Sequence, residues 1–277
     1  WLRAQVRARN LREACLKILG KILATVAALL LAAAALLWWL PARWALPLLQ
    51  PSLHGLHLQQ VGGTLWDGHA DQVVSPDGRE LGHVQWQLSR RALLGQAALQ
   101  LDFAGPQFGL RGRMRKLPSG QVELNDLRAH ADLAALADPR LRLPLGQPRG
   151  ELELHAWRAV LQGGWPLELQ ADWQWRQAAM HMQNDDVALG NLHGTFAAQG
   201  GVIHAQWRDD GQGPLRTTGD LELSLLGWRL EATMQARHAD QALQRWLATL
   251  GKPDADGTLH IARSGGMAAT ITEKAAR

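Results

Sequence analysis

The sequence has few of the residues on which most reactive centres depend. Its one cysteine, Cys15, lies near the start of the chain, so the rest of the chain can form no internal disulfide. Tyrosine is absent, so no phenol is available as an acid or a base. Of the other aromatic residues, tryptophan (13 residues) far outnumbers phenylalanine (3). These absences argue against a disulfide-stabilised module and against thiol or phenol chemistry.

The motifs of common catalytic and nucleotide sites are also missing. There is no Gly-x-Ser-x-Gly, no P-loop, no Gly-x-Gly-x-x-Gly that opens a helix and no His-Glu-x-x-His. His54 and His57 are the closest histidine pair, but on a strand they point to opposite faces. The pairs Asp185–Asp186 and Asp209–Asp210 are typical of polar turns. We therefore expect no enzyme activity, no cofactor and no metal.

One long apolar run divides the chain. Residues 22–40, ILATVAALLLAAAALLWWL, pass without a charge, and a helix of that length matches the roughly 30 Å hydrocarbon core of a bilayer. Trp38, Trp39 and Trp44 stand at its end, where indoles favour the headgroup boundary. The run predicts a transmembrane helix. A cleaved signal peptide is the alternative, but its apolar region is shorter than this run.

The charges beside this run predict its orientation. Residues 1–21 carry six basic residues against Glu13, whereas the remaining 23 basic residues are matched by 24 acidic ones. By the positive-inside rule the N-terminus is cytoplasmic and the chain after about residue 41 is exported. The balanced remainder argues against nucleic-acid binding.

These features give a domain organisation. We expect a cytoplasmic basic segment over 1–21, a transmembrane helix over 22–40 and a proline-marked linker over 41–55. A β-rich domain follows over 56–265, and 266–277 is a flexible tail.

The exported part alternates apolar and polar residues with period two, which is typical of strands wetted on one face. About a dozen such segments follow one another, with Gly or Pro at most junctions. They include 84–88, 99–103, 108–117, 152–156, 167–175, 177–182, 191–197, 202–207, 216–225 and 228–236. Helices are expected only at Asp132–Asp138 and at Asp240–Leu250.

So many strands in one sheet must curl or split. We predict a mainly β fold with one large antiparallel, curved, half-open sheet, capped by the helix at Asp240–Leu250. That arrangement leaves an apolar groove lined by residues such as Leu152, Leu154, Leu167 and Leu169. The alternative is a two-sheet β-sandwich that buries these leucines.

A basic strand face is the only clear charge cluster in the exported part. Arg111, Arg113 and Arg115 alternate along one strand and so share a face. A solvated outer face and a contact with acidic lipid headgroups or an acidic partner both remain open.

Three segments carry a family resemblance. They are VGGTLWDGHA over Val61–Ala70, the Trp86 strand with its Leu-Leu-Gly turn at Gly95, and LGKPDADGTLHIARSG over Leu250–Gly265. In this order, behind one predicted span, they resemble the general secretion pathway protein N family, also called type II secretion system protein N. The residues that carry the resemblance, here termed the signature residues, are turn and packing residues: Gly63, Thr64, Leu65, Trp66, Gly68, Trp86 and Gly95.

The resemblance implies a single-pass inner-membrane protein with a periplasmic β-rich domain. It implies a scaffold rather than an enzyme, one that assists export of folded proteins across the outer membrane. The implied partners are other inner-membrane secretion subunits and the outer-membrane secretin. The chain is also similar to AsmA-like envelope proteins, and this alternative implies that lipid is handled or transferred along the apolar groove.

Overall fold

The computed structural model describes residues 29, 38–44, 55–136, 146–182 and 185–266. The predicted cytoplasmic segment, nearly all of the predicted span and the C-terminal tail lie outside the described residues, as do Cys15 and His54. No helix in the described part combines the length and the hydropathy needed to cross a membrane.

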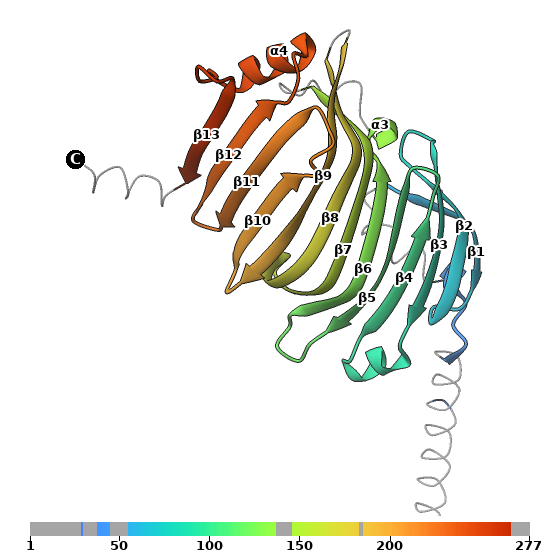
Figure 1. The fold of residues 1–277 in the computed structure, drawn as a ribbon. Helices are drawn as coiled ribbons and strands as arrows, with labels where there is room; N and C mark the ends of the chain where they lie inside the picture. The colour runs from blue at the N-terminus through green and yellow to red at the C-terminus, as the bar shows by residue number, and fades with distance from the viewer. Residues whose placement is uncertain (1–28, 30–37, 45–54, 137–145, 183–184, 267–277) are drawn as a thin grey trace, which may run out of the picture.

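Within the described residues, thirteen strands form one sheet. Each strand pairs antiparallel with its neighbour in sequence, so the strand order is the chain order. The sheet bends and twists along its length (Figure 1), and it is one layer of strands rather than the two of a sandwich. The strands are β1 (His57–Gly63), β2 (Asp67–Val74), β3 (Glu80–Leu88), β4 (Ala98–Ala104), β5 (Phe108–Lys116), β6 (Val122–Asp132), β7 (Gln147–Gln162), β8 (Trp165–Met182), β9 (Asp185–Gln199), β10 (Val202–Asp209), β11 (Leu215–Ser224), β12 (Gly227–Ala236) and β13 (Thr258–Gly266).

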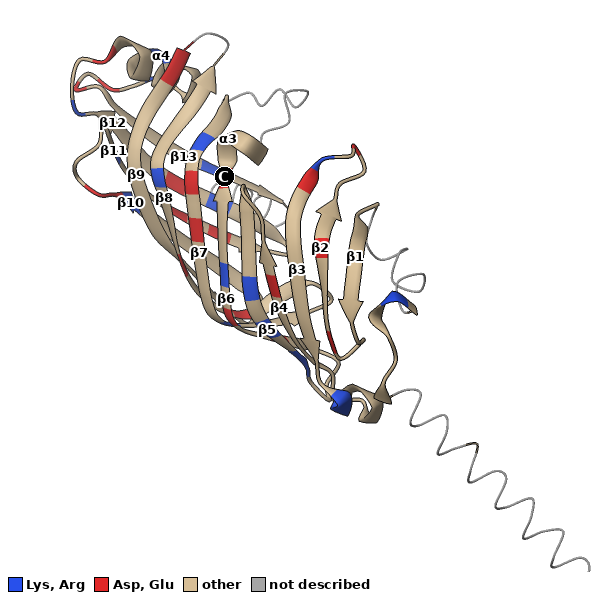
Figure 2. Ribbon diagram, turned by 90° about the vertical axis from the view of Figure 1, so that its right-hand side faces the viewer, with Lys and Arg blue, Asp and Glu red and all other residues tan. Residues whose placement is uncertain are grey.

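Period-two alternation gives the sheet two unlike faces. Trp173, Trp207 and Ala232 lie in one row of paired residues across β8 to β12, while Gln206 and Asp220 belong to a row on the opposite face. Charged residues cross several neighbouring strands in bands (Figure 2). The prediction of strands with one apolar and one polar face is therefore confirmed.

Helix α4 (Gln241–Leu250) covers part of the apolar face. Asp240 caps it, because the side-chain Oδ1 accepts the N–H groups of Ala242 (2.9 Å) and Leu243 (3.1 Å). Leu243 and Leu247 are buried and pack in a cluster with buried strand residues, among them Leu215, Leu259, Val187 and Leu189. The predicted helix is confirmed. A second buried cluster, Ala70, Val73 and Val84, lies on β2 and β3.

Two predicted elements need correction. The segments 167–175 and 177–182 are one strand, β8, with a bulge at Gln177, where φ is +49° and the N–H donates to the Asn191 side chain (2.9 Å). The bulge shifts the alternation, so a continuous strand reads as two. The helix predicted at Asp132–Asp138 begins one residue later, since Asp132 is the last residue of β6. Its described part is α3 (Leu133–Leu136).

Tryptophans lie across glycines of neighbouring strands. A Cβ on Gly219 would come within 2.0 Å of the Trp207 ring, and one on Gly194 within 2.8 Å of the Trp173 ring. These glycines let the indoles lie flat on the sheet, which explains why glycine is tolerated inside strands that otherwise favour branched residues.

Candidate functional site

The turn between β1 and β2 is built by the signature residues. Gly63 has φ +77°, and a Cβ there would come within 2.5 Å of the carbonyl oxygen of Asp67. The N–H of Thr64 donates to the Asp67 carbonyl (2.8 Å), and the Asp67 N–H donates to Thr64 Oγ1 (3.1 Å). This turn therefore needs glycine at position 63 and uses the hydroxyl at position 64.

Trp86 on β3 holds the turn from one side. It is paired with Gly68, and a Cβ on Gly68 would come within 2.4 Å of the indole. The indole N–H donates to the carbonyl of Leu65 (3.1 Å). Trp66 is buried, and its carbonyl accepts the N–H of Leu88 (2.7 Å). The bulky and the small signature residues thus form one contact network.

The same turn binds the end of the predicted span and the residues just after it. We call residues 38–44 the exit segment. The N–H of Leu65 donates to the carbonyl of Leu40 (2.9 Å), and Pro41 forms an antiparallel bridge with Thr64. The end of the apolar run is therefore fixed to the sheet by backbone contacts.

A 3-10 helix between β3 and β4, η2 (Arg90–Leu94), also contacts the exit segment. The Arg90 guanidinium stacks over the Trp38 ring, 4.3 Å from its centroid. Gly95, the last signature residue, ends η2 with φ +82° and donates its N–H to the Ala92 carbonyl (3.0 Å). Figure 1 shows η2 at the same end of the sheet as the β1–β2 turn.

The basic strand face on β5 is largely paired within the sheet. Arg111 Nε donates to Asp102 (2.8 Å), and Arg115 Nε donates to Glu123 (3.1 Å). Among the residues that the structure describes, Arg113 makes no ion pair. Of the three arginines in the predicted contact, only Arg113 keeps an unmatched charge.

Glu123 joins two arginines across three strands. Its side chain is 9% exposed and accepts hydrogen bonds from Arg115 and from Arg158 Nε (3.1 Å). The Arg115 hydrogen bond, aided by Arg158 and opposed by burial, holds the pKa of this carboxyl below its ordinary value. This network gives the polar face a role in stability.

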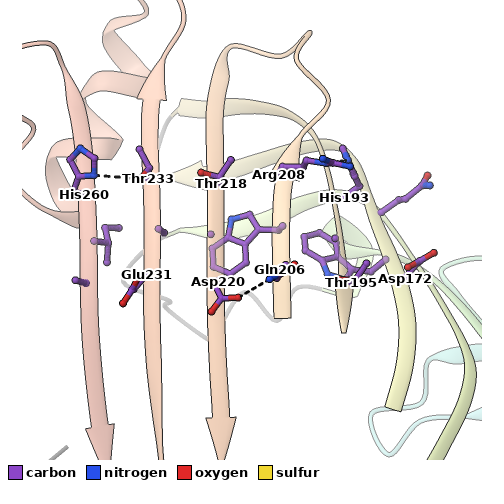
Figure 3. A pocket seen from close by; sticks show the side chains of 18 residues that line it. Asp172, His193, Thr195, Gln206, Arg208, Thr218, Asp220, Glu231, Thr233 and His260 are labelled. Carbon is purple, nitrogen blue, oxygen red and sulfur yellow. Dashed lines mark hydrogen bonds between the residues drawn. The ribbon is translucent and has the colours of Figure 1, made fainter. Parts of the chain in front are cut away.

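A depression of about 980 Å³ lies on strands β8 to β13 (Figure 3). Some of its polar side chains are paired: Arg208 Nε donates to His193 Nε2 (3.0 Å), and Gln206 donates to Asp220 (3.2 Å). Because His193 Nε2 accepts a hydrogen bond from a guanidinium, its lone pair is occupied. Thr233 Oγ1 and His260 Nδ1 also lie 3.4 Å apart there, so the depression presents hydroxyl, imidazole and amide groups that can bind polar ligands.

Comparison of the chain with known proteins identifies its family. A family model described as type II secretion system (T2SS), protein N, matches residues 54–262. That range is about three quarters of the 277 residues. The chain belongs to the type II secretion system protein N family. The predicted resemblance to this family is confirmed, and membership makes this chain a component of type II secretion.

One relative supports the same family. The type II secretion system protein N of Vibrio cholerae serotype O1 (strain ATCC 39315 / El Tor Inaba N16961) is 28% identical over 231 residues. The alignment covers 79% of this chain and 87% of that protein, so the likeness extends well beyond the signature. No solved structure matches the chain.

In this member of the protein N family, one buried ion pair was not predicted from the sequence. Arg237 Nη2 donates to Asp209 (2.7 Å), whose side chain is 6% exposed and also accepts the Thr217 N–H (2.7 Å). Burial opposes ionisation, but the Thr217, Arg237 and Gly211 hydrogen bonds outweigh it and keep the pKa of Asp209 below its ordinary value. The sequence shows a polar turn there, but not its distant arginine.

The remaining acidic and histidine candidates do not converge. Asp185 lies 3.4 Å from Arg245 of α4, whereas Asp186 lies 2.7 Å from His181, so the adjacent carboxylates have different partners. No group of three His, Cys, Asp or Glu side chains in the described ranges could hold a metal ion.

Proposed function

We propose that this chain is a membrane-anchored, non-enzymatic scaffold subunit of a type II secretion system. Residues 22–40 would span the inner membrane, with the N-terminus in the cytoplasm and the sheet in the periplasm. The observation that supports it best is the docking of the exit segment. The signature turn binds Leu40 and Pro41 by backbone contacts, so a span that ends at Leu40 would be coupled to the sheet without slack.

A tethered sheet can assemble neighbours through weak contacts. Confinement to the membrane raises its effective concentration for other subunits on the same surface. In the described part, β1 and β13 each pair with one strand only, so their outer edges can accept a strand from a partner. The proposed partners are other inner-membrane secretion subunits and the outer-membrane secretin, and the proposed result is export of folded proteins across the outer membrane.

Complementation of a strain that lacks the gene tests this function. The full chain should restore secretion, whereas the sheet released into the periplasm behind a cleavable signal in place of residues 1–40 should restore little. Immunoblots matched for periplasmic level are the control. Full restoration by the released sheet would contradict the scaffold, and C-terminal reporter fusions active in the cytosol would contradict the orientation.

The apolar face supports a second candidate, lipid handling of the AsmA-like kind. A row of cross-strand partners runs over β4 to β8 with half-buried side chains, and it borders a depression of about 650 Å³. The row is Phe103, Leu110, Ala129, Leu154 and Trp173. Mass spectrometry of lipid that copurifies with the full chain tests it. One lipid class enriched above the bulk membrane, and lost in Leu154→Glu, would support this candidate, and bulk composition alone would exclude it.

A further inference from the structure

The surface beside the exit segment combines exposed apolar and basic side chains. Leu94 is 82% exposed, the most exposed large apolar side chain in the described part, and Leu93 next to it is 55% exposed. The exit segment adds Trp38, Trp39 and Trp44, which are 48%, 70% and 56% exposed. We call residues 38–44 together with 89–95 the exit surface.

Charge on the exit surface has one sign. It carries Arg43, Arg90 and Arg91, and neither of its two segments contains Asp or Glu. Elsewhere on the sheet, arginines such as Arg111 and Arg115 face carboxylates on neighbouring strands. A surface of tryptophan, leucine and unmatched arginine is the composition that favours the interfacial layer of an anionic bilayer.

We propose that η2 is a second point of membrane contact, with Leu93 and Leu94 in the interfacial layer and Arg90 and Arg91 on anionic headgroups. This inference rests on the proposed membrane anchor. The exit segment begins with the last three residues of the apolar run, and Arg90 over Trp38 places η2 against it. A bilayer that receives the run therefore lies within reach of η2.

Two contacts do what one tether cannot. A single helix can tilt and rotate in the bilayer, and a sheet coupled to its end moves with it. A second contact at η2 fixes the orientation of the sheet on the membrane, and with it the direction in which the edge strands β1 and β13 face partners. The exit surface would thus set the geometry of assembly as well as add to anchoring.

The chain contains its own control. Leu225 and Leu226 form another exposed leucine pair, 75% and 60% exposed, in the turn between β11 and β12. In an antiparallel meander that turn lies at the same end of the strands as η2, but it is eight strands away and contains no arginine. Membrane contact by the exit surface should therefore label Leu94 and spare Leu226.

The test uses the full chain in vesicles of phosphatidylethanolamine and phosphatidylglycerol. In a Cys15→Ser background, Leu94→Cys or Leu226→Cys carries a polarity-sensitive fluorophore, and brominated lipids report contact by quenching. We expect strong quenching at position 94 and little at 226. Arg91→Gln should lower the ratio of docked to undocked label by roughly fivefold, and high salt should do the same.

The outcomes separate this inference from the proposed function. Alkaline extraction reports whether the chain is embedded at all: an extracted chain would overturn the anchor and the inference together. An embedded chain with position 94 unquenched, or quenched no more than position 226, would overturn the η2 contact alone. The η2 contact would also be overturned if the label at position 94 left the aqueous environment only when secretion subunits were added, and not with lipid alone.

Discussion

The two ends of the sheet are held together by different forces. At the C-terminal end, α4 buries Leu243 and Leu247 in an apolar cluster that any well-fitting side chains of the same volume could make. At the N-terminal end, the signature turn depends on a positive φ at Gly63, the close approach of Trp86 to Gly68 and backbone hydrogen bonds to Leu40.

The two ends therefore differ in role: one contributes stability to the sheet, and the other sets the position of the exit segment. Burial at the α4 end contributes free energy without directional demands, since the hydrophobic effect is non-directional. The contacts at the signature turn are directional and fix where the exit segment leaves the sheet. Substitutions at the α4 end should therefore lower stability, and substitutions at the signature turn should also release the exit segment.

The largest effect is expected at the α4 end. Leu243 is fully buried, so Leu243→Ala should lower the free energy of unfolding by about 2–5 kcal/mol through lost burial and the cavity left behind. Urea unfolding of the full chain in detergent, followed by tryptophan fluorescence, measures it. Leu225→Ala, at a 75% exposed position, is the matched control and should change little. Equal losses in both variants would contradict a core under α4.

The ion pair near α4 should come next, and its effect should depend on pH. Arg237→Leu leaves the nearly buried Asp209 carboxylate without its cation, which should cost about 3 kcal/mol at neutral pH. The pKa of Asp209 lies below its ordinary value of 3.8 in the folded chain, so the pair stabilises fully above that value and loses its effect as pH falls through the folded pKa.

Unfolding at a series of pH values measures this dependence. The gap between the wild-type chain and Arg237→Leu should close on acidification. The matched variant Arg216→Leu, on the exposed side of β11, should show a small gap at every pH. A gap for Arg237→Leu that persists at the acid end would mean that Asp209 is not the group involved.

Gly68→Ala should disrupt the signature turn, at the N-terminal end of the sheet. The new Cβ would come within 2.4 Å of Trp86 and 2.7 Å of the Thr64 carbonyl, and we expect a loss of about 1–3 kcal/mol. Hydrogen exchange should also accelerate at the Leu65 N–H, which donates to Leu40. Leu243→Ala at matched stability is the control. If exchange at Leu65 rises equally in both variants, the signature turn does not hold the exit segment by itself.

Much of the architecture could be predicted because side-chain alternation is local. The apolar rows of the strands and the stripe of Leu243, Trp246 and Leu247 follow directly from period two and period 3.6. Bulges could not be predicted. The extra residue at Gln177 shifts the alternation of β8, and no residue type in the sequence signals a bulge at that position.

Contacts between distant residues were also out of reach. Nothing near Asp209 in the sequence points to Arg237, and nothing near Trp38 points to Arg90, because these pairs depend on how the strands line up. The signature residues were recognised as turn and packing residues, yet their contact with Leu40 needed coordinates. A glycine in one strand and a tryptophan in the next, as with Gly68 and Trp86, is a signal that could have indicated their contact.

The smallest effect on stability is expected at Arg113, and it separates folding from recognition. Because Arg113 makes no ion pair within the described residues, Arg113→Glu should change the free energy of unfolding by less than about 0.5 kcal/mol. Arg111→Glu would place two acids side by side at Asp102, so it is the matched variant that should destabilise more.

The predicted contact of this strand face with acidic headgroups or an acidic partner depends on charge that the sheet leaves unmatched. Secretion assays at equal protein level should therefore fall further with Arg113→Glu than with Arg111→Glu, and unchanged secretion in both would leave the arginines of β5 with a purely structural role.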